Sequence, residues 1–247
     1  MKKSTKVILI IITLLVLLYI INVSRNFYII NKISKAYENL VLPNNFQMKI
    51  VQDSIYLNSD FNNSRFYQTI FRKDNKVFIG FSEGKSIDFI DFYTILYYDL
   101  DKKEFYTIYN ENKTYYINND LLNALNYSFD HEIASRIEPF LLSINHVNKT
   151  NTHNLTKLAL TSIITTDETS YTIHSPWYKG KFDKNLLWLP LEEVYKSKLT
   201  DTQTINVDSI DYYDFKVIKY EQNIVPDGDV ALPDLSNYTL QQPTVYN

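Results

Sequence analysis

Side chains that could do chemistry are present in this sequence, but their spacing matches no catalytic or ligand-binding motif. The four histidines include no pair one helical turn apart, which a zinc hydrolase would require; they are His131, His146, His153 and His174. The four glycines form neither a phosphate-binding loop nor the turn that exposes a nucleophilic serine; they are Gly80, Gly84, Gly180 and Gly228. Cysteine is absent, which excludes thiolate metal sites, thiol nucleophiles and disulfides. The sequence therefore predicts no metal site and no cofactor.

Neighbouring carboxylates are the strongest catalytic candidates. Two acidic side chains are enough for glycoside hydrolysis, and Glu192-Glu193 follows Trp188, whose indole could stack on a sugar. The simpler interpretation is that both acids begin a short helix to Lys198, where negative charge is favourable. The acidic residues further on do not follow the calcium-loop pattern; they are Asp208, Asp211, Asp214, Asp227 and Asp229. We expect no catalytic residue and keep a hydrolase using Glu192 or Glu193 as an alternative.

The overall composition is that of a globular, strand-rich protein. Hydrophobic residues make up 45% of the 247 residues and charged residues 21%, which is well above the range of disordered chains. The 21 tyrosines and 14 phenylalanines favour β-strands. The formal net charge is −3, and it becomes −6 once the three positive charges of Lys2, Lys3 and Lys6 are set aside. An acidic body lacks the basic surface that nucleic-acid binding needs, so no nucleic-acid partner is expected.

The N-terminal segment predicts a membrane anchor. Three lysines are followed by an apolar stretch from Val7 to Ile21 that is interrupted only by Thr13. A signal peptidase needs small residues just before the cleaved bond, and this pattern is missing after Ile21. We predict a cytoplasmic leader over 1–6, an uncleaved transmembrane anchor over 7–23 and, from the positive-inside rule, a single-pass protein of the cell membrane with its C-terminal domain outside. A cleaved signal peptide is the alternative.

Beyond the anchor, the hydrophobic period first indicates a helix and then strands. Apolar residues three and four apart predict an amphipathic helix within 24–43, running from Phe27 to Leu42 and ended by Pro43. Alternating apolar residues between Asp- and Asn-rich turns then predict an antiparallel meander. Its expected strands are 46–50, 67–71, 77–81, 92–100, 104–109 and 114–117.

A helical insert and a second set of strands complete the predicted domain. Helices are expected to begin at Asp120 and Asp130, and a third apolar stretch, 140–144, follows the helix breaker Pro139. Residues 149–154 read as a polar loop. Further strands are expected at 158–164, 171–174, 186–189, 204–207 and 213–217. We assign 44–240 to one extracytoplasmic domain and 241–247 to a tail.

Three segments carry a resemblance to a known family. Tyr97-Tyr98-Asp99 leads into a hairpin with 105–109, Leu187-Trp188-Leu189-Pro190 follows, and residues 229–238 read DVALPDLSNY. The last segment resembles the acidic-Val-x-x-Pro-Asp-x-Ser-x-Tyr ending of many Gram-positive members of the lipoprotein-carrier superfamily (LolA/LolB/LppX-like envelope proteins). The order of elements is similar over nearly the whole predicted domain. A lipobox cysteine is missing, so a helix would replace the lipid as the anchor.

The resemblance implies a fold and a function. The fold would be α+β and mainly antiparallel β, with a strongly curved, open half-barrel sheet and the helical insert as its lid. The protein would be a non-enzymatic, membrane-anchored binding protein of the bacterial cell envelope, and the concave face of its sheet would hold a lipid or acyl chain. We take Phe66, Trp177 and Trp188 as the candidate ligand-binding residues.

Two other interpretations stay open. Strands that are apolar on both faces need a cover, but the helical insert could supply it permanently, in which case the aromatic residues are simply core. The chain would then suit an adaptor that docks a cell-envelope or sporulation enzyme. The second is the hydrolase already described.

Overall fold

The computed structural model describes residues 3–55, 64–83, 91–118, 129–137, 152–196 and 212–241. The chain divides into two compact units. Unit 1 comprises Met1–Leu40 and Glu138–Leu191, and unit 2 comprises Val41–Ile137 and Glu192–Asn247. The segment predicted as one extracytoplasmic domain is therefore distributed over both units.

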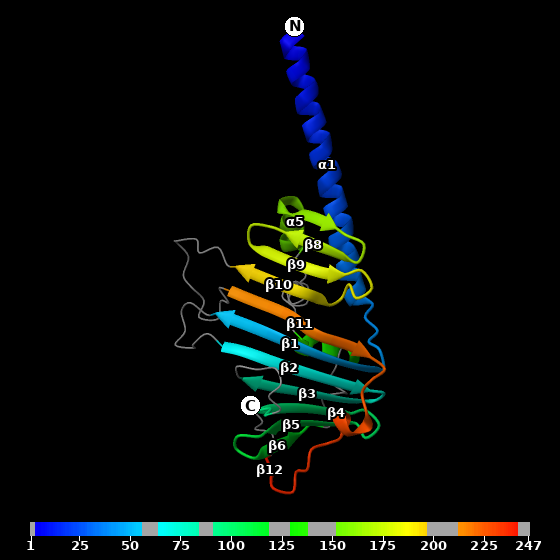
Figure 1. Cartoon of the computed structure of the whole chain (residues 1–247), viewed down its shortest axis with the longest axis vertical. Helices are drawn as coiled ribbons and strands as arrows, with labels where there is room; N and C mark the ends of the chain where they lie inside the picture. The colour runs from blue at the N-terminus through cyan, green and yellow to red at the C-terminus, as the bar shows by residue number, and fades with distance from the viewer. Residues whose placement is uncertain are drawn as a thin grey trace. The chain divides into compact units, whose positions relative to one another are not determined.

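Unit 2 is built on a sheet that begins as an antiparallel meander in chain order (Figure 1). Its strands follow the order β12-β6-β5-β4-β3-β2-β1-β11-β10. The short β12 runs parallel to β6, whereas β11 pairs antiparallel with both β1 and β10. The bounds are Asn45–Ile55 (β1), Ser64–Lys73 (β2), Lys76–Glu83 (β3), Thr94–Asp99 (β4), Glu104–Tyr109 (β5), Thr114–Ile117 (β6), Pro190–Lys196 (β10), Tyr212–Gln222 (β11) and Thr239–Leu240 (β12).

Residue alternation and turn chemistry explain these strands. Phe46, Met48 and Ile50 are all buried on one face of β1, because side chains two residues apart share a face of a strand. The expected turn at Asp74-Asn75 joins β2 to β3, where Lys73 pairs with Lys76. Among the described residues, four non-glycine residues have positive φ: Asp74 (52°), Lys103 (58°), Lys113 (51°) and Asn223 (61°). The first three lie in turns between consecutive strands, where this conformation is typical of tight hairpins, and Asn223 follows the end of β11.

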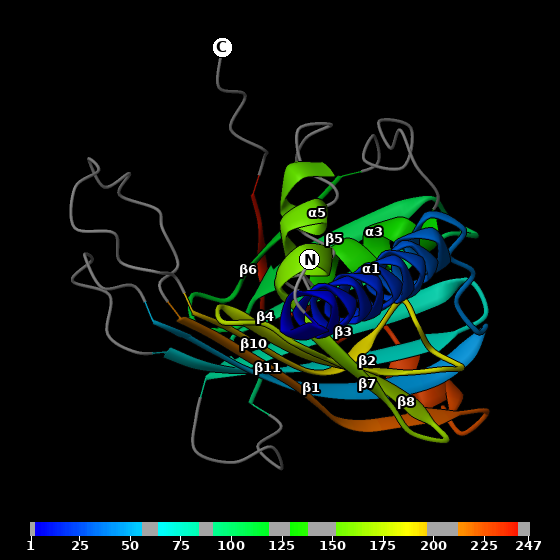
Figure 2. The ribbon, with the colours of Figure 1, turned by 90° about the horizontal axis from the view of Figure 1, so that it is seen from above.

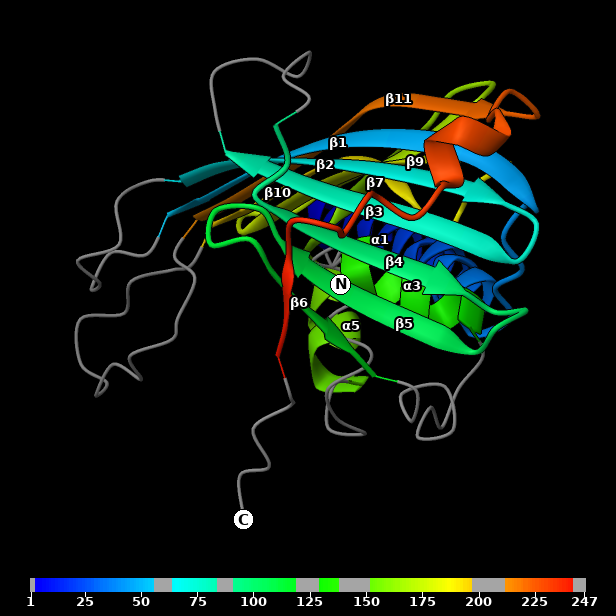
Figure 3. The ribbon, with the colours of Figure 1, turned by 90° about the horizontal axis from the view of Figure 1, so that it is seen from below.

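Different segments cover the two faces of the unit 2 sheet (Figures 2 and 3). The helix α3 (Phe129–Ile137) lies on the face that carries Ile70 and Ile79. We call this the concave face, because Figure 2 shows the strands curving around α3. The opposite, convex face is covered by residues 227–240, which we call the strap; it begins with the short helix η2 (Asp227–Val230) and runs to β12.

The described residues of unit 1 form two helices and three short strands. The helices are α1 (Lys3–Glu38) and α5 (Thr152–Thr161). The strands are β7 (Ile163–Thr166), β8 (Ser170–His174) and β9 (Tyr178–Asp183), which pair antiparallel in the order β9-β8-β7.

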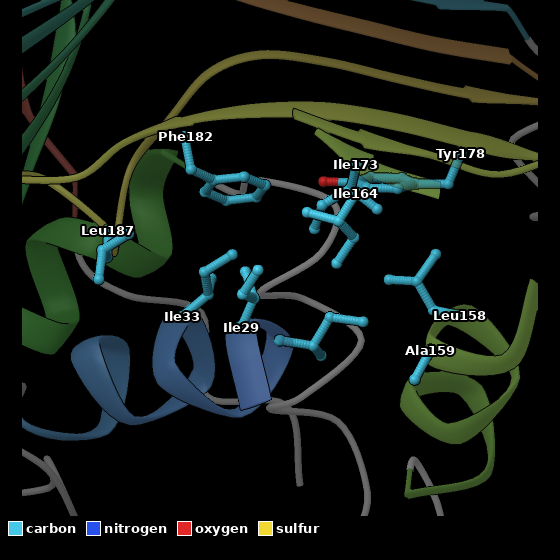
Figure 4. Packing of buried hydrophobic residues seen from close by; sticks show 10 residues of the cluster. Ile29, Ile33, Leu158, Ala159, Ile164, Ile173, Tyr178, Phe182 and Leu187 are labelled. Atoms are coloured by element: carbon cyan, nitrogen blue, oxygen red, sulfur yellow. The ribbon is translucent and has the colours of Figure 1, made fainter. Parts of the chain in front are cut away.

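The core of unit 1 forms where the second half of α1 meets α5 and the strands (Figure 4). Ile29, Ile30 and Ile33 of α1 are buried against this cluster, and their spacing of three and four residues places them on one helix face. Leu158 and Ala159 of α5, Leu187 of the turn after β9 and residues of β7 to β9 complete it; those strand residues are Ile164, Ile173, Tyr178 and Phe182.

The apolar N-terminal segment and the expected amphipathic helix are one continuous helix. An 18-residue window of α1 has a mean hydropathy of 2.9 and no buried residue, which meets the length and composition of a membrane span or of a signal sequence. The polar residues after Ile21 do not break the helix, because Asn26 and Ile29 are held by tertiary contacts. The helix ends at Glu38, four residues before the expected Leu42.

Several expected elements are confirmed and others are wrong. The α+β class with a mainly antiparallel, open and curved sheet and an N-terminal apolar helix is confirmed. The expected strand 158–164 is wrong up to Thr161, because Leu158 and Ala159 are consecutive buried residues of helix α5. The expected strand 186–189 is a turn, closed by a bond from Leu189 N–H to the Leu186 carbonyl. Strand β9 was not predicted.

Some predictions lie outside the described residues. These are the helix beginning at Asp120, the stretch 140–144, the strand 204–207, and the side chains of His146, His153, Asp208 and Asp211. The expected loop 149–154 is described only from Thr152, where α5 already begins.

Candidate functional site

Charged and polar side chains fasten α3 to the concave face at both of its ends. At the N-terminal end, Asp130 Oδ1 lies 2.6 Å from Arg72 Nη1 of β2, and the Leu42 N–H donates to Asp130 Oδ2 at 3.0 Å. At the other end, Gln68 Nε2 donates to the Arg136 carbonyl at 2.8 Å. Gln68, Ile70 and Arg72 alternate along β2 and so share this face. We call the Arg72–Asp130 ion pair the latch.

The latch lies largely out of water, with side chains only 8% and 18% exposed. Burying two charges is costly, and a buried pair therefore contributes little net stability compared with an apolar pair. Removing one partner is strongly destabilising, because the remaining charge is then buried without its partner. The latch thus gives α3 one preferred position.

A second polar group joins the middle of α3 to β4. The fully buried Tyr98 donates its O–H to Glu132 Oε1 at 3.3 Å, and the same oxygen accepts bonds from Arg136 Nε (2.8 Å) and Nη2 (2.6 Å). The Tyr98 ring stacks on Phe105 and meets Phe129 edge-on, with centroids 4.5 and 5.4 Å away. Burial raises the pKa of Tyr98 far above its usual value; Arg136 opposes this effect and Glu132 adds to it.

The raised pKa of Tyr98 predicts a loss of stability in strongly alkaline solution. A tyrosine in the unfolded chain ionises near pH 10, whereas the folded protein disfavours the buried phenolate. The resulting stabilisation is complete below about pH 10 and is lost as the pH rises through the higher folded-state pKa. Tyr97 and Tyr106 on the convex face act in the same direction, since burial raises the pKa of each to about 12.

An alkaline titration checks this prediction. We expect one group of tyrosines to gain phenolate absorbance only as the circular dichroism of the strands disappears. The variant Tyr98→Phe should lose one tyrosine from that late group. Identical late amplitudes in both proteins would contradict the assignment.

The α3 helix is too short to cover the whole concave face. Nine residues of helix extend ~13.5 Å, whereas the ten residues of β2 extend ~33 Å. Gln68 contacts the C-terminal end of α3, and Phe66 is one alternation further along the same face of β2. Phe81 of β3 lies opposite Gln68 on the concave face, and both phenylalanines are only half-buried. Two aromatic rings thus lie beside and beyond the end of α3.

On the convex face, the strap covers an aromatic cluster. Phe78, Ile95, Tyr97, Tyr106 and Ile108 are buried there, and three strap residues pack against them: Leu232, Leu235 and Tyr238. This is the segment that carries the family resemblance, and its role in unit 2 is to cover the sheet.

Hydrogen bonds fix the strap at its end. Tyr238 donates its O–H to Asn110 Oδ1 at 2.6 Å, and Asn110 Nδ2 in turn donates to the Phe92 carbonyl. Lys113 Nζ donates to the Tyr238 oxygen at 3.2 Å, and the Thr239 N–H donates to the Lys113 carbonyl at 2.9 Å. Gly80 belongs to the same layer, because a Cβ at this position would collide with the Phe92 ring.

The three candidate ligand-binding residues belong to different units. Phe66 lies on the concave face of unit 2, as described above. Trp177 and Trp188 both belong to unit 1. Trp177 is half-buried against the core of that unit with Lys157 Nζ 5.9 Å from its ring centroid, whereas Trp188 is 6% exposed in the turn before β10.

Glu192 and Glu193 begin no helix, contrary to the expectation from sequence. They are consecutive residues of strand β10 and therefore point to opposite faces of the sheet. Glu192 Oε1 is 3.3 Å from Lys216 Nζ at an exposed position, whereas Glu193 is fully buried. Two carboxylates on opposite faces cannot flank one glycosidic bond, so this geometry does not support the hydrolase interpretation.

Sequence reasoning missed the polar groups that hold α3. Their signal was present, because Arg72 interrupts the apolar alternation of β2 and an arginine at a core-facing position implies a buried partner. Asp130 was noted only as a helix-capping residue. In the structure its carboxylate binds Arg72 and the Leu42 N–H instead.

Comparison with known proteins gives likenesses of fold at very low sequence identity. No protein-family model matches the chain, and no curated protein sequence matches it. Among solved structures, a LolA superfamily protein from Nitrosomonas europaea is 6% identical, with a TM-score of 0.33 over 82% of this chain and 97% of the other.

Two further solved structures are similar over comparable parts of the chain. PNGF-II is 9% identical with a TM-score of 0.31, over 81% of this chain but only 31% of its own. A DUF1329 family protein from Desulfovibrio piger is 9% identical with a TM-score of 0.20, over 85% and 97% of the two chains. The first of these three proteins is a member of the superfamily that the sequence was said to resemble. No function is assigned from these likenesses.

Proposed function

We propose that the chain is a membrane-anchored, extracytoplasmic binding protein and that the concave face of unit 2 holds an apolar ligand such as a lipid or acyl chain. The observation that carries this proposal is that, among the described residues of unit 2, a short helix with polar fastenings covers only part of an apolar face. Ile70, Ile79 and Leu96 are buried on that face. The helix α3 extends along less than half of β2.

The proposed ligand site lies at the C-terminal end of α3. Next to and beyond Arg136, the half-buried rings of Phe66 and Phe81 supply apolar contact area, and the exposed Glu83 lies opposite Phe66. An acyl chain needs little more than such a surface, because its binding is driven by removal of apolar area from water. Trp177 and Trp188 remain candidates for the same role on unit 1, and Trp177 offers more exposed ring surface than Trp188.

The anchor is the second part of the proposal. The exposed apolar surface of α1 from Val7 to Ile21 would lie in the bilayer. The three lysines that precede it would stay in the cytoplasm, so unit 2 and the part of unit 1 that follows Val23 would lie outside. An anchored binding protein holds its ligand close to the membrane that supplies it.

Photolabelling tests the ligand site in the full-length protein. Vesicles containing a phospholipid with a diazirine on its acyl chain are irradiated, and the labelled peptides are mapped by mass spectrometry. We expect label in the peptides of β2 and β3 as well as in α1, and a roughly tenfold loss of the β2 and β3 label in the double variant Phe66→Glu, Phe81→Glu. Ile218→Glu is the matched control, since Ile218 is an exposed apolar residue of the same unit.

Label confined to α1 in the unmodified protein would contradict ligand binding on the concave face. Recovery of a stoichiometric envelope protein together with such a result would support the adaptor interpretation instead. The two tryptophans are the only ones in the chain. Quenching of their fluorescence by a brominated acyl chain therefore tests unit 1 separately.

A further inference from the structure

The exposure of α1 changes between Ile21 and Asn26. From Val7 to Ile21 its apolar side chains are 50–63% exposed, whereas Asn26, Ile29 and Ile30 are at most 4% exposed. Because the helix is continuous from Lys3 to Glu38, no flexible linker separates the apolar segment from the part that is packed into unit 1.

Hydrogen bonds join α1 to α5 and β7 at the position where its exposure changes. Asn26 Nδ2 donates to the carbonyls of Ala159 (3.1 Å) and Ser162 (2.7 Å), which end α5. Arg25 Nη2 donates to Thr166 Oγ1 of β7 at 2.8 Å. The end of α5 and the strand β7 therefore lie level with residues 25 and 26 of α1.

The length of the apolar segment then gives the distance of residues 25 and 26 from the hydrocarbon core of the bilayer. The 17 residues from Val7 to Val23 extend ~25 Å, and the hydrocarbon core of a bilayer is about 30 Å thick. A span this short brings its flanking residues close to the hydrocarbon boundary. Arg25 and Asn26 would thus lie in the headgroup layer, which is about 5–7 Å thick on each side.

Apolar side chains are exposed at this same level. Leu160 at the end of α5 is 45% exposed and Ile163 at the start of β7 is 67% exposed; they flank the Ser162 whose carbonyl binds Asn26. Phe27 and Tyr28 of α1 are 40% and 67% exposed, and tyrosine is enriched at membrane interfaces. β7 is also the last strand in the sheet order, and Figure 1 shows β8 and β9 further from the N-terminal end of α1 than α5.

We propose that Leu160 and Ile163 insert into the interfacial layer of the leaflet from which α1 emerges, so that unit 1 is seated directly on the lipid surface. The occupant of this apolar edge is the bilayer, since the contacts of Arg25 and Asn26 place it about one helical turn past Ile21, where the exposed apolar segment of α1 ends. This inference rests on the proposed anchor. It adds a membrane-contact site formed by α5 and β7, and it fixes the height of unit 1 above the membrane.

Three cross-strand neighbours provide labelling positions at regular distances from the proposed membrane surface. Ile163 pairs with His174, and His174 pairs with Lys179. All three side chains are exposed on one face of β7, β8 and β9, at steps of about 4.8 Å. The chain has no native cysteine, so Ile163→Cys, His174→Cys and Lys179→Cys can each carry one nitroxide label.

The experiment compares collision of each label with oxygen, which partitions into lipid, and with a water-soluble nickel chelate. Full-length protein is placed in vesicles of phosphatidylcholine and phosphatidylglycerol. We expect the oxygen-to-nickel ratio to be several-fold higher at 163 than at 179, with 174 between them, and a ratio at Leu160→Cys similar to that at 163. Equal, aqueous values at all four positions would overturn the seating of unit 1.

A label at Leu15→Cys separates the two proposals. A deep lipid value at 15 with aqueous values at 160 and 163 would leave the anchor intact and reject the membrane-contact site. An aqueous value at 15 would reject the anchor itself.

Discussion

Replacing Arg72 with methionine is expected to lower the free energy of unfolding by about 3–4 kcal/mol. The change removes one partner of the latch while keeping a long side chain in the core. Asp130 then remains 18% exposed without its cation, and among the described residues the Leu42 N–H donates to it. Most of the cost comes from this stranded carboxylate rather than from the lost attraction. Chemical denaturation monitored by circular dichroism measures the change.

A matched control is available on the same strand. Arg65 of β2 donates two hydrogen bonds to Asp53, at 2.8 and 2.7 Å, which is geometrically better than the latch. Its side chain is 57% exposed, however, so water replaces the partner when the pair is broken. Arg65→Met should leave the unfolding midpoint almost unchanged. Equal losses in Arg65→Met and Arg72→Met would show that burial is not the cause.

The double variant Arg72→Met, Asp130→Asn tests whether the unpaired charge of Asp130 causes the loss of stability. Asparagine is neutral and still accepts a hydrogen bond through its side-chain oxygen, so it leaves no stranded charge and should recover most of the stability lost in Arg72→Met. If α3 also limits access to the concave face, Arg72→Met should take up more photolabel on β2 and β3 than the unmodified protein. Loss of label in that variant would contradict α3 as a cover over the ligand site.

The parts of the fold that follow from local rules could be predicted from sequence. The turn at Asp74-Asn75 and the alternation of Phe46, Met48 and Ile50 each depend on a few neighbouring residues, and both are confirmed. The helix α5 could not be predicted in this way. Leu158 and Leu160 alternate as a strand would, and only their contacts with α1 show that Leu158 and Ala159 form a helical face.

The candidate site was harder to predict than the fold, because its residues meet only in three dimensions. Arg72 and Asp130 are far apart in the chain, and nothing in the local sequence pairs them. Glu192 and Glu193 are adjacent in sequence, which suggested that their carboxylates could act together. In strand β10 they point to opposite faces of the sheet, so they cannot do so. The distinctive segment 229–238 was found from sequence, but its contacts with Tyr97 and Ile108 show that its role is to cover the convex face.

Removing the strap's apolar side chains is expected to destabilise the protein as strongly as breaking the latch. Leu232, Leu235 and Tyr238 are each half-buried against the convex cluster. The triple variant Leu232→Ala, Leu235→Ala, Tyr238→Ala should cost about 4–5 kcal/mol, because it exposes the large apolar side chains beneath. It also removes the bond from Tyr238 to Asn110 and the Lys113 ammonium 4.8 Å from the ring centroid.

Leu240→Ala serves as the control for the strap. Leu240 lies in β12, two residues after Tyr238, and its side chain is 53% exposed. Truncating it should therefore change the free energy of unfolding by less than about 0.5 kcal/mol. The triple variant should also bind a hydrophobic dye before it unfolds, since Phe78, Tyr97 and Ile108 become accessible to solvent. If it unfolds at the same denaturant concentration as Leu240→Ala, the strap does not stabilise the convex face, and the distinctive ending would need another explanation in ligand or partner binding.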